Sequence, residues 1–165
     1  MSRIGAGKTI LVIDDDRDLL PSLVETIQAF SDFTVVTADN GVTALERFFE
    51  VHPDCVMVDV RMPGLDGYQL VRMLRGDAQT ASVPLIILTA LAREQNRFVG
   101  LASGADQYLV KPVRPKALME AIRNALAASP EERARRLSGL ADSEPPQPDD
   151  AETKPEPKRS GSSEG

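Results

Sequence analysis

Three consecutive aspartates follow a run of four aliphatic residues near the start of the chain. Residues 10–13 read ILVI, and Asp14, Asp15 and Asp16 come next. Two unit charges 4 Å apart repel by about 1 kcal/mol in water, and by about 4 kcal/mol at an effective dielectric constant near 20. Carboxylate oxygens without a histidine and cysteine set suit a hard cation such as Mg²⁺. We therefore expect a divalent cation to neutralise this cluster.

Three further polar residues stand at the ends of other apolar runs. Asp59 ends the run CVMVD, Thr89 follows PLIIL, and Lys111 follows QYLV. A carboxylate can act as a nucleophile towards a phosphoryl group, and such a transfer depends on positioning and charge neutralisation. Each residue alone has an ordinary structural explanation, with Asp16, for example, as a helix N-cap. Their convergence is what indicates phosphoryl chemistry.

Five short apolar runs must bring these residues together. They are residues 9–13, 33–38, 55–59, 84–88 and 107–110. Runs that are β-branched and apolar on both faces are typical of a parallel sheet covered on both sides. The runs alternate with segments of helical period, which predicts a doubly wound, five-stranded parallel sheet of the α/β class. In such sheets ligands bind at the carboxyl ends of the strands, where these polar residues stand.

Helical spacing of apolar residues predicts five helices between and after these strands. The first uses Leu19 to Ile27, the second follows Asn40 as N-cap, the third runs from Tyr68 to Leu74, the fourth uses Phe98, Leu101 and Ala102 before Gly104, and the fifth uses Leu118 to Leu126.

The character of the sequence changes after residue 128. Residues 129–132, SPEE, have the form of a capping box with proline at the first helical position, which predicts a short helical extension over 129–140. Residues 141–165 are dominated by Pro, Asp, Glu, Lys and Ser, so we expect a disordered tail. The predicted domain comprises residues 1–128.

Composition limits the classes of function. The 165 residues carry a formal net charge of −6 and one cysteine. A negative charge argues against nonspecific binding to nucleic acid or to an anionic membrane, and one cysteine fits a reducing compartment. No apolar stretch approaches 18 residues, so we expect no membrane insertion and a cytoplasmic location.

Four segments together resemble the receiver domain of bacterial two-component response regulators. They are ILVIDDD (10–16), VDVRMPGLDG (58–67), ILTAL (87–91) and GADQYLVKP (104–112). The resemblance covers residues 8 to about 128. It implies the flavodoxin-like strand order 2-1-3-4-5 of stand-alone chemotaxis-type receivers, and a Mg²⁺ cofactor.

The same resemblance assigns roles to the metal-binding and acceptor residues. Asp59 is expected to accept the phosphoryl group. Asp15, Asp59 and the backbone carbonyl of Arg61 are expected to hold Mg²⁺, with Asp14 acting mainly through a bound water.

Three further positions follow from the resemblance. Thr89 and Lys111 are expected to contact the phosphoryl oxygens, and the Lys111–Pro112 bond is expected to be cis. Tyr108 matches the switch aromatic, which turns inward when Thr89 moves towards the phosphate.

The function implied is a phosphorylation-driven switch, not an enzyme that turns over a substrate. A histidine kinase or a histidine phosphotransfer protein would donate the phosphoryl group to Asp59. The output would be protein binding through the face of the fourth helix, fifth strand and fifth helix. Residues 129–165 hold no recognisable effector module, so we expect no direct DNA binding.

Two residues bear on the lifetime of the phosphoryl group. Arg61 and Leu91 occupy positions that, in the family, influence access of a hydrolytic water. Leu91 cannot orient a water, and Arg61 could pair with the phosphate. We therefore expect a long-lived phosphorylated state.

Other interpretations compete with the switch. GAGKT (5–9) resembles the end of a Walker A loop, but it precedes a strand and its first glycine would fall at Ser2. IDDDRD approaches the D-x-D signature of haloacid-dehalogenase-like phosphatases, with Asp14 as nucleophile. A receiver-shaped interaction module that is never phosphorylated is the third alternative.

Overall fold

The computed structural model describes residues 5–90 and 104–141. Its centre is a five-stranded parallel sheet with the order β2-β1-β3-β4-β5, which confirms the predicted fold class and strand order. The strands are β1 (Thr9–Ile13), β2 (Thr34–Ala38), β3 (Cys55–Asp59), β4 (Leu85–Thr89) and β5 (Gln107–Val110). Because all pairings between them are parallel, the five strands end at the same edge of the sheet.

The three central strands are buried along nearly their whole length, as their apolar composition predicts. Every residue of β3 and β4 is buried, and in β1 only Thr9 is partly exposed. The edge strands β2 and β5 are more exposed. Both faces of the sheet must therefore be covered by helices.

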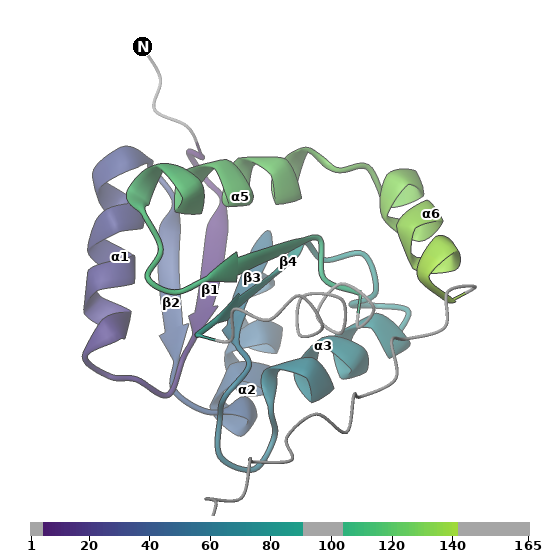
Figure 1. The fold of residues 1–165 in the computed structure, drawn as a ribbon, viewed down its shortest axis with the longest axis horizontal. Coiled ribbons are helices and arrows are strands. Elements are labelled where there is room, and N and C mark those ends of the chain that lie inside the picture. The colour runs from purple at the N-terminus through teal and green to yellow at the C-terminus, as the bar shows by residue number, and fades with distance from the viewer. Residues whose placement is uncertain (1–4, 91–103, 142–165) are drawn as a thin grey trace, which may run out of the picture.

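Two layers of helices provide that cover (Figure 1). The crossover helices are α1 (Leu19–Phe30), α2 (Gly41–Val51) and α3 (Gly67–Gly76), and α5 (Pro115–Ala127) follows the last strand. Successive side chains of a strand point to opposite faces. Accordingly, Ile10 and Val12 of β1 pack with residues of α1 and α5, whereas Leu11 and Ile13 pack with residues of α2 and α3.

Local signals explain where two of these helices begin. Asn40 caps α2 as predicted, since its side chain accepts a hydrogen bond from the Thr43 N–H at 2.9 Å. α3 begins one residue earlier than the predicted Tyr68, because Asp66 and Gln69 form a reciprocal capping box.

The strand boundaries differ slightly from the predicted ones. β4 covers 85–89 instead of 84–88, so Thr89 is its last residue. Pro84 accepts a hydrogen bond from Val56 N through its carbonyl but has no N–H of its own to donate. β2 begins at Thr34, one residue later than predicted.

A further helix, α6 (Pro130–Ala141), follows α5. Its start has the capping box read from the sequence, with Ser129 and Glu132 bonding each other's backbone N–H groups. α6 includes Ala141, so the predicted boundary between the helical extension (129–140) and the tail (141–165) is wrong by one residue. The predicted fourth helix, over Phe98, Leu101 and Ala102, and the rest of the predicted tail lie outside the described residues. No helix over residues 5–90 and 104–141 is long and apolar enough to cross a membrane.

Candidate functional site

Strand register places the chemically active residues next to one another. Ile13, the last residue of β1, pairs with Val58 of β3. The residues that follow these two, Asp14 and Asp59, therefore lie side by side. Asp59 in turn pairs with Leu88 of β4. One step further, Thr89 pairs with Val110 of β5, and Lys111 comes next. Four strands thus deliver their polar residues to one edge.

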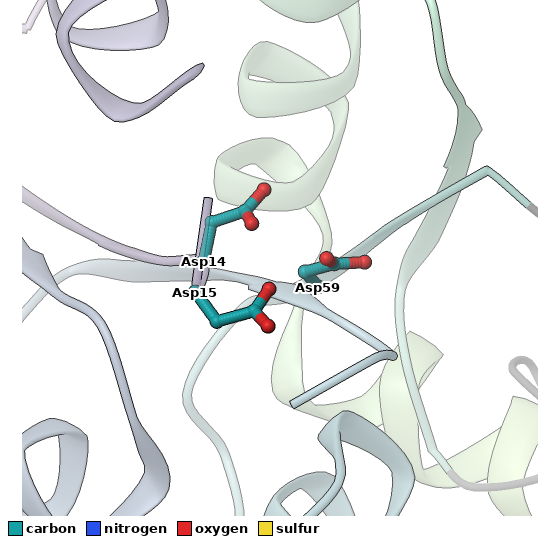
Figure 2. A group of neighbouring side chains, drawn as sticks. All are labelled: Asp14, Asp15 and Asp59. Atoms are coloured by element: carbon teal, nitrogen blue, oxygen red, sulfur yellow. The ribbon is translucent and has the colours of Figure 1, made fainter. Parts of the chain in front are cut away.

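Three carboxylates gather at this edge, as Figure 2 shows. Asp14, Asp15 and Asp59 each offer one oxygen, and these oxygens lie within 4.8 Å of one another. Asp14 and Asp59 are buried, whereas Asp15 is exposed. Carboxylate oxygens this close suit a hard divalent cation, and one solvent-facing member leaves room for the waters that Mg²⁺ retains. The donor set therefore fits the predicted cofactor.

Lys111 is in direct contact with two members of the cluster. Its Nζ lies 2.8 Å from Asp14 Oδ2 and 3.3 Å from Asp59 Oδ2. The other Asp14 oxygen, Oδ1, accepts a hydrogen bond from the backbone N–H of Asp16 at 2.9 Å. Both oxygens of Asp14 are thus engaged. The Lys111–Pro112 bond is cis, as the resemblance implied.

Burial and like charge set the electrostatics of the acceptor candidate. Burial raises the pKa of Asp59, and the charge of Asp14 raises it further. The ammonium of Lys111 and a hydrogen bond from the Arg61 backbone oppose this rise without cancelling it. For Lys111, burial lowers the pKa, but the hydrogen bonds and charges of Asp14 and Asp59 together raise it above its ordinary value. An added cation would relieve the excess negative charge.

Asp16 has a different task from its two neighbours. Its Oδ1 accepts hydrogen bonds from the backbone N–H groups of Asp18 at 3.0 Å and Leu19 at 3.2 Å. It therefore holds the turn that leads into α1, although the N-cap residue of that helix is Asp18, and not Asp16 as the sequence suggested. The run of three aspartates divides into two residues of the carboxylate cluster and one that stabilises the turn before α1.

The loop after β3 approaches Asp59 closely. A Cβ atom added at Gly67 would clash with the backbone carbonyl of Asp59, and the Gly67 N–H donates to Val60 O at 3.0 Å. Only glycine allows the loop to close this tightly. Arg61, the second residue of the loop, is exposed. Its carbonyl remains a predicted metal ligand.

Thr89 and Tyr108 belong to the neighbouring strands β4 and β5. Thr89 ends β4 and is fully buried, and its carbonyl accepts a hydrogen bond from Lys111 N at 2.7 Å. Tyr108 lies in β5 and is half-buried. Its side chain forms a hydrogen bond with that of Tyr68 in α3. Burial raises the pKa of Tyr68, and the contact with Tyr108 raises it further.

Two residues of this site were not singled out from the sequence. The role of Gly67 had a signal, since it closes the Pro/Gly-rich loop RMPGLDG, but the atom it approaches is not readable from sequence. Tyr68 was assigned only to the start of a helix. Its pairing with Tyr108, forty residues further on, carries no sequence signal.

The fold is a doubly wound parallel sheet, and the carboxyl ends of its strands bring together paired carboxylates and a lysine. This combination defines the class of protein to which the chain belongs. Residues 10–123 match the family model of the response regulator receiver domain. The chain belongs to this family.

Relatives and solved structures agree with this assignment. The chain is 41% identical over 117 residues to the probable transcriptional regulator ycf27 of Guillardia theta, covering 71% of this chain and 44% of that protein. It is 38% identical over 135 residues to the DNA-binding response regulator MtrA of Mycobacterium tuberculosis strain H37Rv, covering 82% and 57%. The chain thus spans about half the length of these relatives.

Two solved structures are similar over most of their length. One is a putative response regulator from Chloroflexus aurantiacus, with a TM-score of 0.70 and 32% identity, covering 73% of this chain and 98% of that one. The other is the chemotaxis response regulator CheY4 of Vibrio cholerae, with a TM-score of 0.67 and 28% identity, covering 72% and 98%.

Proposed function

We propose that this receiver accepts a phosphoryl group on Asp59, in a Mg²⁺-dependent transfer from a histidine kinase or a histidine phosphotransfer protein. One observation carries the proposal: Asp59 ends a buried strand beside Asp14 and Asp15, with the Lys111 ammonium 3.3 Å from one of its oxygens. Family membership supports the same chemistry.

The transfer uses groups that this chain supplies. An Asp59 oxygen forms a bond to phosphorus while the phosphorus–nitrogen bond of the donor histidine breaks, and the released imidazole nitrogen takes up a proton. Lys111, which donates a hydrogen bond to Asp59 Oδ2 at 3.3 Å, would neutralise part of the charge of the phosphoryl oxygens. The Thr89 hydroxyl, at the end of the adjacent strand, would donate a hydrogen bond to one of them.

The carboxylate cluster would hold the metal ion. Asp15, Asp59 and the Arg61 carbonyl would bind Mg²⁺ directly, and Asp14 would act through water. When bound, Mg²⁺ offsets the negative charge that accumulates as phosphate approaches the carboxylates. Asp14 is also held by Lys111, which keeps its charge balanced and its oxygens in place.

The switch would be read by another protein. Phosphorylation adds negative charge beside Thr89 and Lys111. Thr89 ends β4, the strand next to β5, and Lys111 directly follows β5, the strand that contains Tyr108. Movement of Thr89 and Tyr108 would remodel the face of the predicted fourth helix, β5 and α5 for a downstream protein. The absence of direct DNA binding stays a prediction, since MtrA is named a DNA-binding response regulator. A cytoplasmic location is likewise a proposal, and it is consistent with membership of the receiver family.

The geometry disfavours the phosphatase alternative. Asp14 is fully buried, with one oxygen bonded to the Asp16 N–H and the other to Lys111 at 2.8 Å. Asp59 is 5% exposed, and its contact with Lys111 is longer, at 3.3 Å. Asp59 is therefore the more accessible and less tightly held of the two carboxylates.

Intact mass spectrometry tests the proposal. The protein is incubated with Mg²⁺ and acetyl phosphate, beside its Asp59→Asn variant and the matched variant Asp18→Asn, whose carboxylate is exposed. We expect one added phosphoryl group on the parent and on Asp18→Asn, none on Asp59→Asn, and none without Mg²⁺. An adduct that persists in Asp59→Asn and is lost in Asp14→Asn would contradict the proposal and favour phosphatase-like chemistry.

A further inference from the structure

The end of the sheet opposite the aspartates contains a second cluster of charged residues, and it is buried. Asp106 immediately precedes β5 and is 5% exposed, and Arg133 in α6 is also 5% exposed. The side chain of Arg75, from α3, is 7% exposed. Charged residues are almost never this deeply buried unless they are paired, and here both arginines pair with Asp106. Because the three residues come from α3, the start of β5 and α6, the cluster joins three segments that are far apart in the sequence.

The guanidinium of Arg133 donates hydrogen bonds from all three of its nitrogens. Nε binds Asp106 Oδ1 at 2.7 Å, and Nη1 binds the Ser82 carbonyl at 2.7 Å. Nη2 donates to the Ala125 and Ala128 carbonyls, at 3.3 and 3.4 Å. Those two carbonyls belong to the last turn and the C-cap of α5, where backbone acceptors lack partners within the helix. Arg133 thus donates both to acceptors that precede β4 and β5, namely the Ser82 carbonyl and Asp106, and to the last carbonyls of α5.

Arg75 holds the same carboxylate from the other side. Its Nη2 lies 2.9 Å from Asp106 Oδ2, which also accepts a hydrogen bond from the Leu85 N–H at 2.9 Å. Its Nε donates to the Gly104 carbonyl at 2.8 Å. Burial lowers the pKa of Arg75 to about 10, Asp106 opposes this, and Arg133 adds to it. Asp106 is therefore held in place by contacts that do not involve Arg133.

These contacts define a site of one carboxylate and three carbonyls, whose several acceptors suit the fork of donors on a guanidinium. We propose that the receiver carries a guanidinium-binding site formed by Asp106, the Ser82 carbonyl and the last carbonyls of α5, and that α6 occupies it through Arg133. α6 is then an integral part of the domain, and it fixes the direction in which the chain leaves α5 (Figure 1). The family match ends at residue 123, so this site binds a segment beyond the shared domain. The predicted boundary at residue 128 would accordingly move to include α6.

Amide hydrogen exchange of the full chain tests this proposal. Arg133→Met removes the guanidinium while keeping an apolar stem, and Arg135→Met is the matched control, because Arg135 lies on the same helix and is exposed. We expect exchange over residues 130–141 to be about tenfold faster or more in Arg133→Met, and in Arg135→Met to stay within about twofold of the parent. Exchange in α1, which is remote from the site (Figure 1), serves as the internal reference.

A lysine variant separates charge from shape. In Arg133→Lys the ammonium keeps the charge but cannot span the carboxylate and three carbonyls, so α6 should again exchange faster than in the parent. This variant also carries the comparison if Arg133→Met does not fold. Unchanged exchange over 130–141 in both Arg133 variants, or equal acceleration in Arg135→Met, would overturn the proposal. The test involves neither Mg²⁺ nor phosphorylation, so its result is independent of the proposed function.

Discussion

The Lys111 ammonium lies 2.8 Å from the Asp14 carboxylate and thereby links the end of β5 to the end of β1, across β3 and β4. The same nitrogen lies 3.3 Å from Asp59. One cation is therefore shared between a carboxylate that stays in place and a carboxylate that is proposed to react. Its removal should affect both the charge balance and the chemistry of this edge.

Replacing Lys111 with methionine should slow phosphorylation of Asp59. Without the ammonium, the pKa of Asp59 should rise further, because Lys111 opposes the effects of burial and Asp14. The transferred phosphoryl group would also lose a charge partner. We expect the rate of adduct formation with acetyl phosphate and Mg²⁺ to fall by about tenfold or more.

The control for this change is Lys116→Met, which removes an exposed lysine from the first turn of α5. Its rate should match that of the parent. Equal rates for Lys111→Met and the parent would show that Lys111 has a structural role only.

Neutralising Asp59 should stabilise the protein when no divalent cation is present. The pKa of Asp59 is raised in the folded state by burial and by Asp14, so the folded state binds the proton more tightly than the unfolded state. Its ionisation thus lowers stability as pH rises through and above the ordinary aspartate range near 3.9. We expect Asp59→Asn to raise the free energy of unfolding at pH 7 by on the order of 1 kcal/mol after solvent screening.

Urea unfolding in EDTA measures this effect at pH 7 and at the lowest pH where both proteins fold. The gain should shrink at the lower pH, because Asp59 becomes protonated in the parent. The exposed Asp18→Asn serves as control. A gain that is independent of pH would mean that packing, not charge, is responsible.

Mg²⁺ should stabilise the parent by binding the folded carboxylate cluster. A ligand at about 100 times its dissociation constant adds about 2.7 kcal/mol to the free energy of unfolding. We expect the thermal midpoint to rise with Mg²⁺ concentration in the parent and in Asp18→Asn, and much less in Asp15→Asn. Equal rises in all three proteins would contradict a metal site at Asp14, Asp15 and Asp59.

Sequence reasoning located the strands and the candidate site because both depend on local patterns. Asp14, Asp59, Thr89 and Lys111 each end an apolar run or follow one, and parallel strands share their carboxyl edge. The pairing register of β1 and β3 then places Asp14 beside Asp59. The boundary of β4 was misplaced by one residue, since Pro84 is apolar like the strand but cannot donate to the sheet.

The buried charges at the opposite end could not be predicted in the same way. Arg75 and Asp106 are 31 residues apart, and Arg133 lies 27 residues beyond Asp106. No periodic pattern connects such residues, and Arg133 stands in a charged segment that is typical of an exposed helix. The capping box of Asp66 and Gln69, in contrast, has a recognisable D-x-x-Q spacing that could have placed the start of α3.

Gly67 should not tolerate a side chain, although Gly76 at the other end of α3 should. A Cβ at Gly67 would clash with the backbone carbonyl of Asp59, whereas one at Gly76 would meet nothing within 4 Å. We expect Gly67→Ala to cost about 1–3 kcal/mol of stability and to slow phosphorylation, because the loop and Asp59 must move apart. Gly76→Ala should be nearly neutral or slightly stabilising. Urea unfolding and adduct formation measure both effects, and equal behaviour of the two variants would contradict this explanation.

Arg61 should prolong the life of the phosphorylated state. It is exposed at the start of the loop that follows Asp59, where its guanidinium could pair with a phosphoryl group on that residue and obstruct an attacking water. We expect Arg61→Asn to shorten the half-life of the adduct several-fold after the donor is removed, as followed by intact mass over time. Arg72→Asn, which changes an exposed arginine of α3, should leave the half-life unchanged. Leu91, the second residue of this prediction, lies outside the described residues, so Arg61→Asn alone decides the contribution of the arginine. An unchanged half-life in Arg61→Asn would mean that the guanidinium neither pairs with the phosphate nor shields it.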